Sequence, residues 1–269
     1  MATTASWASR EAAEGWRDRG PERRRANGPA LAAMLDEAGL RPGMRVLDLG
    51  AGTGDATIDA ARRVGPTGSV LAVDISQAML DVLAEEAAKA GVANITTLAA
   101  DAAALDLEPA SLDAAVSANC IQFVPDVGAA LRAVRRALRP GAVFAAIVVP
   151  HSALNPEAVV RRAAGLPAPP PEAPNPQRLG APGRLESEFR AAGFADVAVR
   201  SVAHVNSFPS VDAFVQGLSR NANTMHLLDQ LDDARREHVL RAVEEDVARF
   251  ATPDGVRFPW ELLVGRGEA

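Results

Sequence analysis

The sequence predicts a doubly wound α/β fold, in which helices cover both faces of a mostly parallel, seven-stranded sheet and further helices form a cap. Short aliphatic runs alternate with longer stretches of helical periodicity between residues 41 and 150. This alternation indicates parallel strands joined by helical crossovers. The chain has 269 residues, 48% of them hydrophobic, which is enough for one large core. We therefore expect a single domain over residues 1–269.

The first 40 residues are expected to form a helical cap. Apolar and charged residues recur there at helical spacing from Trp7 onward, and Gly39 ends the pattern. Residues 41–150 then form the core, and residues 151–269 form a C-terminal part with the last two strands. The predicted strands are residues 45–49, 69–73, 95–99, 112–117, 142–149, 197–205 and 256–264. The predicted helices of the core and C-terminal part are residues 55–64, 76–90, 127–138 and 184–192.

The alternation of strands and helices stops after Pro150. Residues 165–177 contain six prolines, which cannot continue a helix or a central strand. We interpret this segment as a loop at the rim of the active site that contacts substrate, although an ordinary exposed linker explains it equally well. Residues 210–250 are mostly helical in pattern, with Ser210 as a plausible N-cap, and such a long insertion between neighbouring strands is expected to form a lid.

Composition argues against several classes of partner. The net charge is −6 and the arginines are scattered among acids, which disfavours a surface that follows nucleic-acid phosphates. Cys120 is the only cysteine, so no internal disulfide can form. The first 20 residues lack the apolar core of a signal peptide, and no apolar run approaches the ~20 residues of a membrane span. We expect a cytoplasmic protein without a membrane partner.

The strongest motif is VLDLGAGTGD at residues 46–55, where three glycines follow a strand and precede a helix. Glycines let the backbone turn sharply and approach a ligand closely. A glycine trio alone is weak evidence, because a tight strand-to-helix turn can need it for packing. Asp55 occupies the position at which a dinucleotide fingerprint has its third glycine, so nicotinamide binding is the weaker interpretation.

Three acids stand at the ends of three consecutive strands. Asp48 lies just before the first glycine, Asp74 ends the run VLAVD, and Asp101 lies in LAADA. Each acid alone would more often be a helix cap or a turn former. Together they suit an adenosine lying along the strand ends, with Asp74 accepting from both ribose hydroxyls and Asp101 accepting from the adenine amine.

These residues resemble the class I S-adenosylmethionine-dependent methyltransferases. The resemblance covers about residues 41–149 and rests on VLDLGAGTGD, VDIS, AADA, SLDAAVSANCIQFVPD and LRPGAVFAAIVV. Within that family the chain is similar to the ubiquinone/menaquinone C-methyltransferases and to many bacterial natural-product enzymes, and DGVRFPWELLVGRG is similar to their final strand. The resemblance implies S-adenosylmethionine as cofactor. It implies these cofactor-binding residues: Asp48, Gly50, Ala51, Gly52, Thr53, Gly54, Asp74, Ile75, Met79, Asp101, Ala102 and Asn119.

Methyl transfer needs alignment and desolvation of the reactants, and it needs a base only if the nucleophile arrives protonated. Plant phenolic O-methyltransferases carry a histidine base in a stretch resembling CIQFVPD, but Gln122 stands there in this chain. Glutamine orients a hydroxyl or carbonyl and cannot take its proton. His151, after the fifth strand, and His226, in the lid, are the other candidate catalytic residues. The alternative interpretation of each histidine is an ordinary polar or solvent-exposed side chain without a catalytic role.

Other residues are expected to be structural. His204 and His238 are interpreted as strand and solvated residues, and Cys120 as a small buried side chain. Trp7 and Trp16 either line the cofactor pocket or anchor the N-terminal helix to the core. No metal-ligand spacing is present in the sequence.

The acceptor is expected to be a small, fairly apolar metabolite, with methylation at oxygen, nitrogen or carbon, and a homodimer is among the expected assemblies. The strand after the third acid lacks the signature of enzymes that methylate base amines, so a nucleic-acid substrate is disfavoured. Two alternatives remain. One is an S-adenosylmethionine-binding enzyme that catalyses cyclisation or decarboxylation, and the other is a non-catalytic subunit that binds the cofactor.

Overall fold

The computed structural model describes residues 8–170, 175–220 and 222–269 of the chain. Its strands are β1 (Arg45–Leu49), β2 (Ser69–Asp74), β3 (Ile95–Ala99), β4 (Leu112–Ala118), β5 (Leu138–Val148), β6 (Ala195–Phe208), β7 (Ala251–Thr252) and β8 (Gly255–Glu268). Its α-helices are α1 (Arg10–Asp18), α2 (Gly20–Glu37), α3 (Asp55–Val64), α4 (Gln77–Lys89), α5 (Val127–Ala137), α6 (Pro156–Ala163), α7 (Arg184–Ala191), α8 (Val211–Arg220), α9 (Ala222–Leu228) and α10 (Asp233–Ala248). Short 3-10 helices, η2 (Ala102–Ala104) and η3 (Ile121–Phe123), follow β3 and β4.

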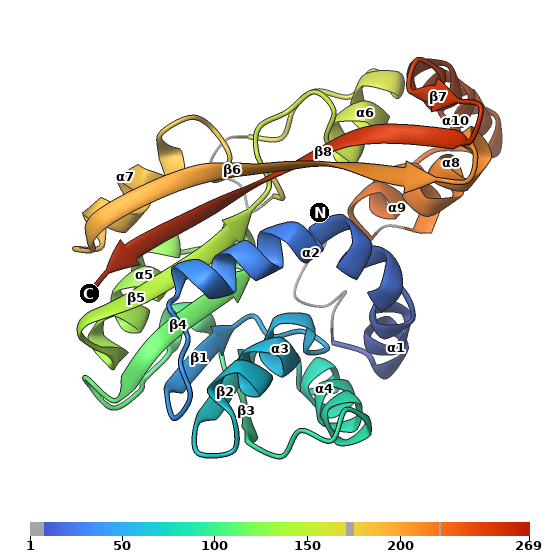
Figure 1. Ribbon diagram of the computed structural model, residues 1–269. Helices are drawn as coiled ribbons and strands as arrows, with labels where there is room; N and C mark the ends of the chain where they lie inside the picture. The colour runs from blue at the N-terminus through green and yellow to red at the C-terminus, as the bar shows by residue number, and fades with distance from the viewer. Residues whose placement is uncertain (1–7, 171–174, 221) are drawn as a thin grey trace.

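The strands form one sheet in the order β3-β2-β1-β4-β5-β8-β6, and β7 pairs with β8 alone (Figure 1). The first five strands run parallel to their neighbours. β8 is antiparallel to β5, and β6 is antiparallel to β8. The predicted mostly parallel, doubly wound sheet is therefore confirmed, with the two-residue strand β7 as an addition.

Alternate residues of the central strands face two separate cores. Leu47 and Phe144 lie in a cluster with α5 and α7, whereas Val46 and Ile147 lie in a cluster with α2 and α3. α4 packs with α3 on the second face, against Ala72 of β2. Both faces of β1, β4 and β5 are thus buried, which explains why these strands read as nearly continuous apolar runs.

The N-terminal segment differs in detail from the expected helical cap. It is divided into α1 and α2, which change direction at Arg19, and Trp7 lies outside the described residues. The helix α6 was not predicted, because the prolines around it masked an eight-residue amphipathic turn that Asn155 caps. Of the proline-rich segment 165–177, residues 171–174 lie outside the described part of the chain.

The last two strands of the sheet are much longer than their apolar patterns predicted. β6 and β8 stay paired from Ala195 to Phe208, although β8 stops pairing with β5 at Leu263. The remaining ribbon of β6 and β8 runs past the sheet toward α8 and α10 (Figure 1). A third apolar cluster, built from α6, α8, α9, α10 and Phe258 of β8, surrounds this extension. Ser210 precedes α8 and accepts from the N–H of Ala213 at 3.0 Å, as predicted for an N-cap.

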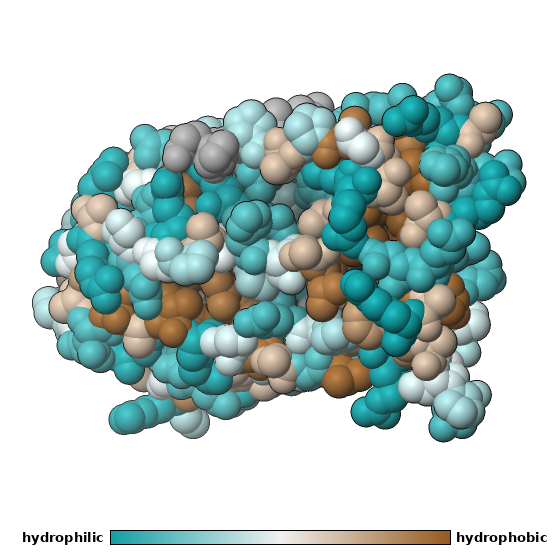
Figure 2. Space-filling model, turned by 90° about the horizontal axis from the view of Figure 1, so that it is seen from above, coloured by the Kyte–Doolittle hydropathy of each residue, from teal (hydrophilic) through white to brown (hydrophobic). Residues whose placement is uncertain are grey.

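The surface seen from above mixes hydrophilic side chains with small groups of hydrophobic ones (Figure 2). Few large apolar side chains are strongly exposed, and Ile75 and Val205 are among them at 50% and 47%. Within the described part of the chain, no helix combines the length and apolar character that crossing a membrane requires.

A buried carboxyl group joins β1 to α3. Asp48 is 0% exposed, and its Oδ2 accepts from the Thr57 hydroxyl at 2.6 Å. Its Oδ1 has no hydrogen-bond partner among the described residues. Burial raises the pKa of Asp48 to about 7, because a carboxylate loses its hydration there and the Thr57 hydroxyl restores only part of it.

Stacked aromatic rings join α7 to the sheet. The ring of Phe189 lies 5.4 Å from that of Phe144 and 5.3 Å from that of Phe194, measured between centroids. A Cβ on Gly267 of β8 would lie only 2.7 Å from the Phe189 ring, so the strand makes room for the helix by having no side chain there. Phe189 is therefore a central packing residue on this face.

We predict that Phe189→Ala lowers the free energy of unfolding by about 3–5 kcal/mol, because it removes a fully buried ring and leaves a cavity. Urea unfolding followed by circular dichroism measures this change. Val205→Thr, at a 47% exposed position, is the control and should shift the free energy by about 0.5 kcal/mol or less. Equal effects of the two substitutions would contradict this account of the core.

We predict that Asp48→Asn changes how stability depends on pH. The pKa of Asp48 is higher in the folded state than in the unfolded state. Its protonation therefore contributes fully to the free energy of unfolding below about pH 4, and this contribution is lost as pH rises toward 7. The wild type should therefore lose up to about 1.4 kcal/mol per pH unit relative to Asp48→Asn between pH 5 and 6.5. If the free energy of unfolding depended on pH in the same way in the wild type and in Asp48→Asn, Asp48 would not be the group that is protonated in the folded state.

Candidate active site

The turn between β1 and α3 contains a glycine that no other residue could replace without movement. Gly50 has a φ of 77°, and a Cβ on it would lie 2.1 Å from the Sγ atom of Cys120, just after β4. The N–H groups of Gly50 and Ala51 both donate to the carbonyl of Val73, at 2.7 and 3.0 Å. The turn is therefore tied to β2 and lies directly against the end of β4.

Asp74, the last residue of β2, fixes the same turn through its side chain. Its Oδ2 accepts from the N–H of Gly52 at 2.9 Å, and its Oδ1 accepts from the N–H of Ser76 at 2.9 Å. Burial raises the pKa of Asp74 above its usual value, while these backbone donors oppose the shift. The carboxylate is only half-buried, so it can accept further hydrogen bonds from a ligand on the turn.

The three predicted acids do lie at or just after the ends of neighbouring strands, because β1, β2 and β3 are adjacent in the sheet. Their surroundings differ. Asp48 is buried beneath the turn, whereas Asp101 is exposed and accepts from the N–H of Ala103 at 2.9 Å, which caps η2. Ala102 is the first residue of η2 and is partly exposed. Asp74 and Asp101 therefore face the surface of this edge, and Asp48 supports it from below.

Further predicted residues lie around this edge. Ile75 is 50% exposed just beyond Asp74, whereas Met79 is 3% exposed and packs against Ala13 of α1. Asn119, after β4, has a φ of 56°, which is uncommon for a residue other than glycine. Its Oδ1 is buried without a hydrogen-bond partner in the part of the chain that the structure describes. Such backbone strain together with an unpartnered acceptor is typical of a ligand site.

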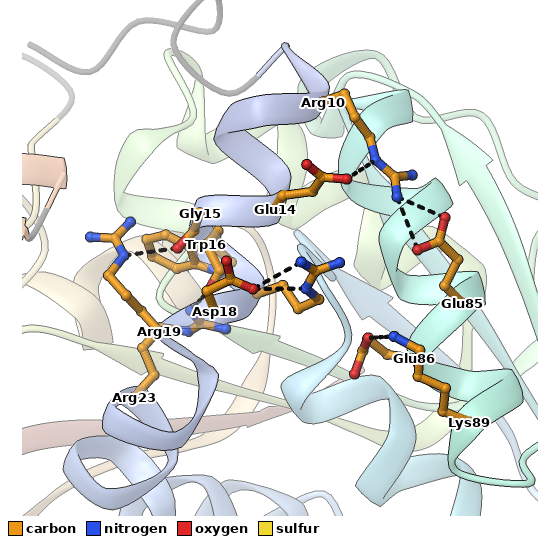
Figure 3. Close-up of polar contacts among 11 residues, drawn as sticks. Arg10, Glu14, Gly15, Trp16, Asp18, Arg19, Arg23, Glu85, Glu86 and Lys89 are labelled. Carbon is orange, nitrogen blue, oxygen red and sulfur yellow. Dashed lines mark hydrogen bonds and ion pairs between the residues drawn. The ribbon is translucent and has the colours of Figure 1, made fainter.

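The junction of α1 and α2, which carries Trp16, Arg19 and Arg23 (Figure 3), lies against the glycine turn. The Arg23 guanidinium lies 2.9 Å from the Asp55 carboxylate, donates to the Thr53 hydroxyl at 3.3 Å and lies 4.3 Å from the centroid of the Trp16 ring. Arg23 also donates to the backbone carbonyl of Trp16. The indole nitrogen of Trp16 would lie 3.7 Å from a Cβ on Gly52. Trp16 and Arg23 thus lie directly over the turn.

A second set of contacts holds α1 against α4. Arg10 pairs with Glu85 of α4 at 2.8 Å and with Glu14 of its own helix at 2.8 Å, as Figure 3 shows. Ala13 of α1 is fully buried against Met79 and its neighbours. Sequence reasoning weighed Trp16 for this region but missed Arg23, because Arg23 lies in a run of three arginines that the sequence alone does not distinguish.

The predicted catalytic residues have different environments. Gln122 lies in η3 and is 0% exposed, and both its amide oxygen and its amide nitrogen lack partners among the described residues. His151 is exposed after β5, where its backbone N–H donates to the carbonyl of Gly180 at 2.9 Å. His226 lies on α9, and its Nε2 is 3.0 Å from the amide nitrogen of Gln230. Gln122 is the buried member of the three.

Three polar side chains that the sequence did not single out as functional lie on the ribbon of β6 and β8. His204 is paired with Trp260 across the two strands, and Asn206 follows two residues later on the same face. Both ring nitrogens of His204, the Asn206 amide nitrogen and the Trp260 indole nitrogen are buried without hydrogen-bond partners in the described residues. The sequence feature that could have identified them is the pair of polar residues, His204 and Asn206, at alternate positions of a strand.

The described residues offer little for metal or thiol chemistry. They contain no group of three or more His, Cys, Asp or Glu side chains that could hold a metal ion. Burial raises the pKa of the Cys120 thiol above its usual value, and its Sγ fills the space that a side chain on Gly50 would need.

Comparison with known proteins identifies the family. A family described as a methyltransferase domain matches residues 46–141. The nocamycin O-methyltransferase of Saccharothrix syringae is 30% identical over 254 residues, which cover 88% of this chain and 90% of that protein. The ubiquinone/menaquinone biosynthesis C-methyltransferase UbiE of Vibrio cholerae is 39% identical over 108 residues, but these cover only 40% of this chain and 42% of that protein.

A solved structure shares the fold. The YcgJ protein from Bacillus subtilis has a TM-score of 0.58 and 20% identity, with 88% of this chain and 97% of that chain covered. The full-length similarity to the O-methyltransferase and the glycine turn with its strand-end acids agree with this fold. The chain therefore belongs to the class I S-adenosylmethionine-dependent methyltransferases.

Proposed function

We propose that this enzyme transfers the methyl group of S-adenosylmethionine to an ionised oxygen of a small, largely apolar molecule made in bacterial secondary metabolism. The observation that carries the proposal is the glycine turn that Asp74 holds at the edge of the sheet, beside the unpartnered Asn119 and Gln122. The choice of oxygen is supported by the relative named an O-methyltransferase, which matches this chain over 90% of its own length.

The residues present at the edge fit an adenosine joined to an amino acid. Asp74 offers carboxylate oxygens for ribose hydroxyls, and the exposed Ile75 and Asp101 offer an apolar face and an acceptor for adenine. The turn at residues 50–54 has no side chain larger than that of Thr53, so its backbone can lie close to the polar tail of the cofactor. The Oδ1 of Asn119 is a buried acceptor without a described partner. Trp16 and Arg23 would cover the bound cofactor from above.

S-adenosylmethionine supplies an electrophilic methyl group on a positively charged sulfur. In the proposed reaction the acceptor oxygen forms its bond to this carbon as the carbon–sulfur bond breaks, and the electron pair leaves with S-adenosylhomocysteine. An acceptor that arrives as a carboxylate or enolate has no proton to lose, so Gln122 need only orient it. His151 and His226 are the candidate bases for an acceptor that arrives protonated.

We propose that α8, α9 and α10 act as the lid over the acceptor. These helices pack around the extension of β6 and β8, which continues beyond the edge of the sheet that carries Asp74 and Asn119 (Figure 1). The Ala-, Leu- and Val-rich composition of the lid suits an acceptor with an apolar body.

The proposed function predicts that purified enzyme forms S-adenosylhomocysteine with at least one member of a panel of carboxylic acids, enolised 1,3-dicarbonyls and phenols. Liquid chromatography with mass detection measures S-adenosylhomocysteine and the methylated acceptor. Asp74→Ala and Asp74→Asn should weaken S-adenosylmethionine binding by about 10- to 100-fold in calorimetry, since each loses hydrogen bonds to a charged acceptor.

Asp81→Asn is the matched control for this experiment, because Asp81 is an exposed acid on α4 that pairs with Gln77. It should bind S-adenosylmethionine like the wild type. Preferential binding of NADH, or equal binding by the wild type and both Asp74 variants, would contradict the cofactor assignment. Cofactor binding that is followed by an isomerised product without S-adenosylhomocysteine would instead indicate a non-methylating enzyme.

We predict that Arg23→Gln weakens S-adenosylmethionine binding about three- to tenfold, whereas Arg24→Gln changes it less than about twofold. Both arginines pair with Asp55, but the Arg23 side chain is 15% exposed and reaches Thr53 and Trp16, while that of Arg24 is 42% exposed. Calorimetry and the dissociation rate measure the effect. Equal losses in the two variants would show that only surface charge is involved.

A further inference from the structure

His204, Asn206 and Trp260 lie beyond the edge of the sheet at which the active site is built. β8 pairs with the end of β5 at Leu263 and Val148, and Leu263 is paired with Ser201 of β6. His204 and Trp260 are three residues farther along each strand, or roughly 10 Å past this edge. The carboxyl ends of β1 and β4 reach the same edge, since they run parallel to β5.

These three side chains interrupt an otherwise apolar face. On one side of them Leu262 and Val202 belong to the cluster under α2, whereas Phe258, which is paired with Asn206, belongs to the cluster of the lid helices. The Trp260 ring contacts both clusters. Asn206 is only 6% exposed. The polar atoms therefore lie between the core cluster and the cluster of the lid helices.

Buried polar atoms without partners are costly, and three residues with such atoms on one face call for an explanation. The Asn206 amide nitrogen and the Trp260 indole nitrogen can only donate hydrogen bonds, and a neutral imidazole donates from one nitrogen. None of these atoms has a hydrogen-bond partner in residues 8–170, 175–220 and 222–269. The group thus leaves hydrogen-bond donors unpaired between the core cluster and the cluster of the lid helices.

We infer that His204, Asn206 and Trp260 recognise the acceptor by donating hydrogen bonds to carbonyl, carboxylate or enolate oxygens on an apolar molecule. This inference rests on the proposed function and names its substrate class. Because these residues lie roughly 10 Å along the ribbon from the strand ends, an acceptor that reaches both needs an extended apolar body, and we test a fused-ring one. Gln122 would then hold the reacting end near Asn119, while the donor group holds the far end.

The experiment uses three naphthalene probes with the same apolar body. 1-Naphthoic acid carries a carboxylate, 2-hydroxy-1,4-naphthoquinone carries an enolate with carbonyls, and naphthalene carries no oxygen. Calorimetry measures binding of each probe to the full chain, with and without saturating S-adenosylhomocysteine. We expect at least one oxygenated probe to bind tenfold or more tightly than naphthalene, and the preferred probe distinguishes a carboxylate from an enolate.

The variants Trp260→Phe, Asn206→Leu and His204→Phe should each weaken binding of the preferred probe about five- to tenfold and leave naphthalene binding unchanged. Ser207→Ala, on the opposite, exposed face of β6, is the control and should bind like the wild type. The variants should also be as thermally stable as the wild type or more stable, because an unpartnered polar group is replaced by an apolar one.

Any of three results would overturn the inference. The first is binding of the oxygenated probes no tighter than that of naphthalene. The second is unchanged binding of the preferred probe in all three variants, and the third is a loss of thermal stability in each variant, which would reveal structural hydrogen bonds. Failure of the proposed function is seen separately, since S-adenosylhomocysteine titrated alone would then not bind, while the probes still report on the donor group.

Discussion

The hydrogen bond between the Gly52 N–H and the Asp74 carboxylate is the interaction on which the active site depends. It fixes the turn after β1 against the end of β2, while Cys120 after β4 occupies the space that a side chain at Gly50 would need. The ends of three neighbouring strands therefore meet at this turn, at the edge where we propose that the ligands bind. The positive φ of Gly50 is a consequence of this arrangement, and so is the close cover provided by α1.

The ribbon of β6 and β8 continues beyond this edge, where we propose the acceptor site. Because both strands continue past β5, they carry His204 and Trp260 beyond the strand ends and give α8, α9 and α10 a surface on which to pack. In the proposed function the cofactor and acceptor parts are thus built on different elements. The first uses the turn and the strand ends, and the second uses the ribbon, η3 and the lid. Different acceptors can therefore be accommodated without altering the cofactor site.

Much of the core was predictable from sequence because its signals are local. The aliphatic runs of β1 to β5 and the glycine turn specify their own conformations, and Asp74 and Asp101 follow from strand ends. The cap was not predictable in the same way. Arg23 and Trp16 acquire their roles from a change of direction at Arg19, and His204 became noticeable only when Trp260 was placed opposite it, some 56 residues later in the sequence. Such long-range pairings leave little trace in spacing.

Hydrogen–deuterium exchange with and without S-adenosylmethionine tests the central claim most directly. The account predicts that the cofactor slows exchange in residues 50–55, after β2 at residues 74–79, and in α1 and the start of α2, because the turn and its cover close on one ligand. Protection confined to other elements, such as α7 and the far ends of the strands, or no protection at saturating cofactor, would contradict the placement of the active site at this edge of the sheet.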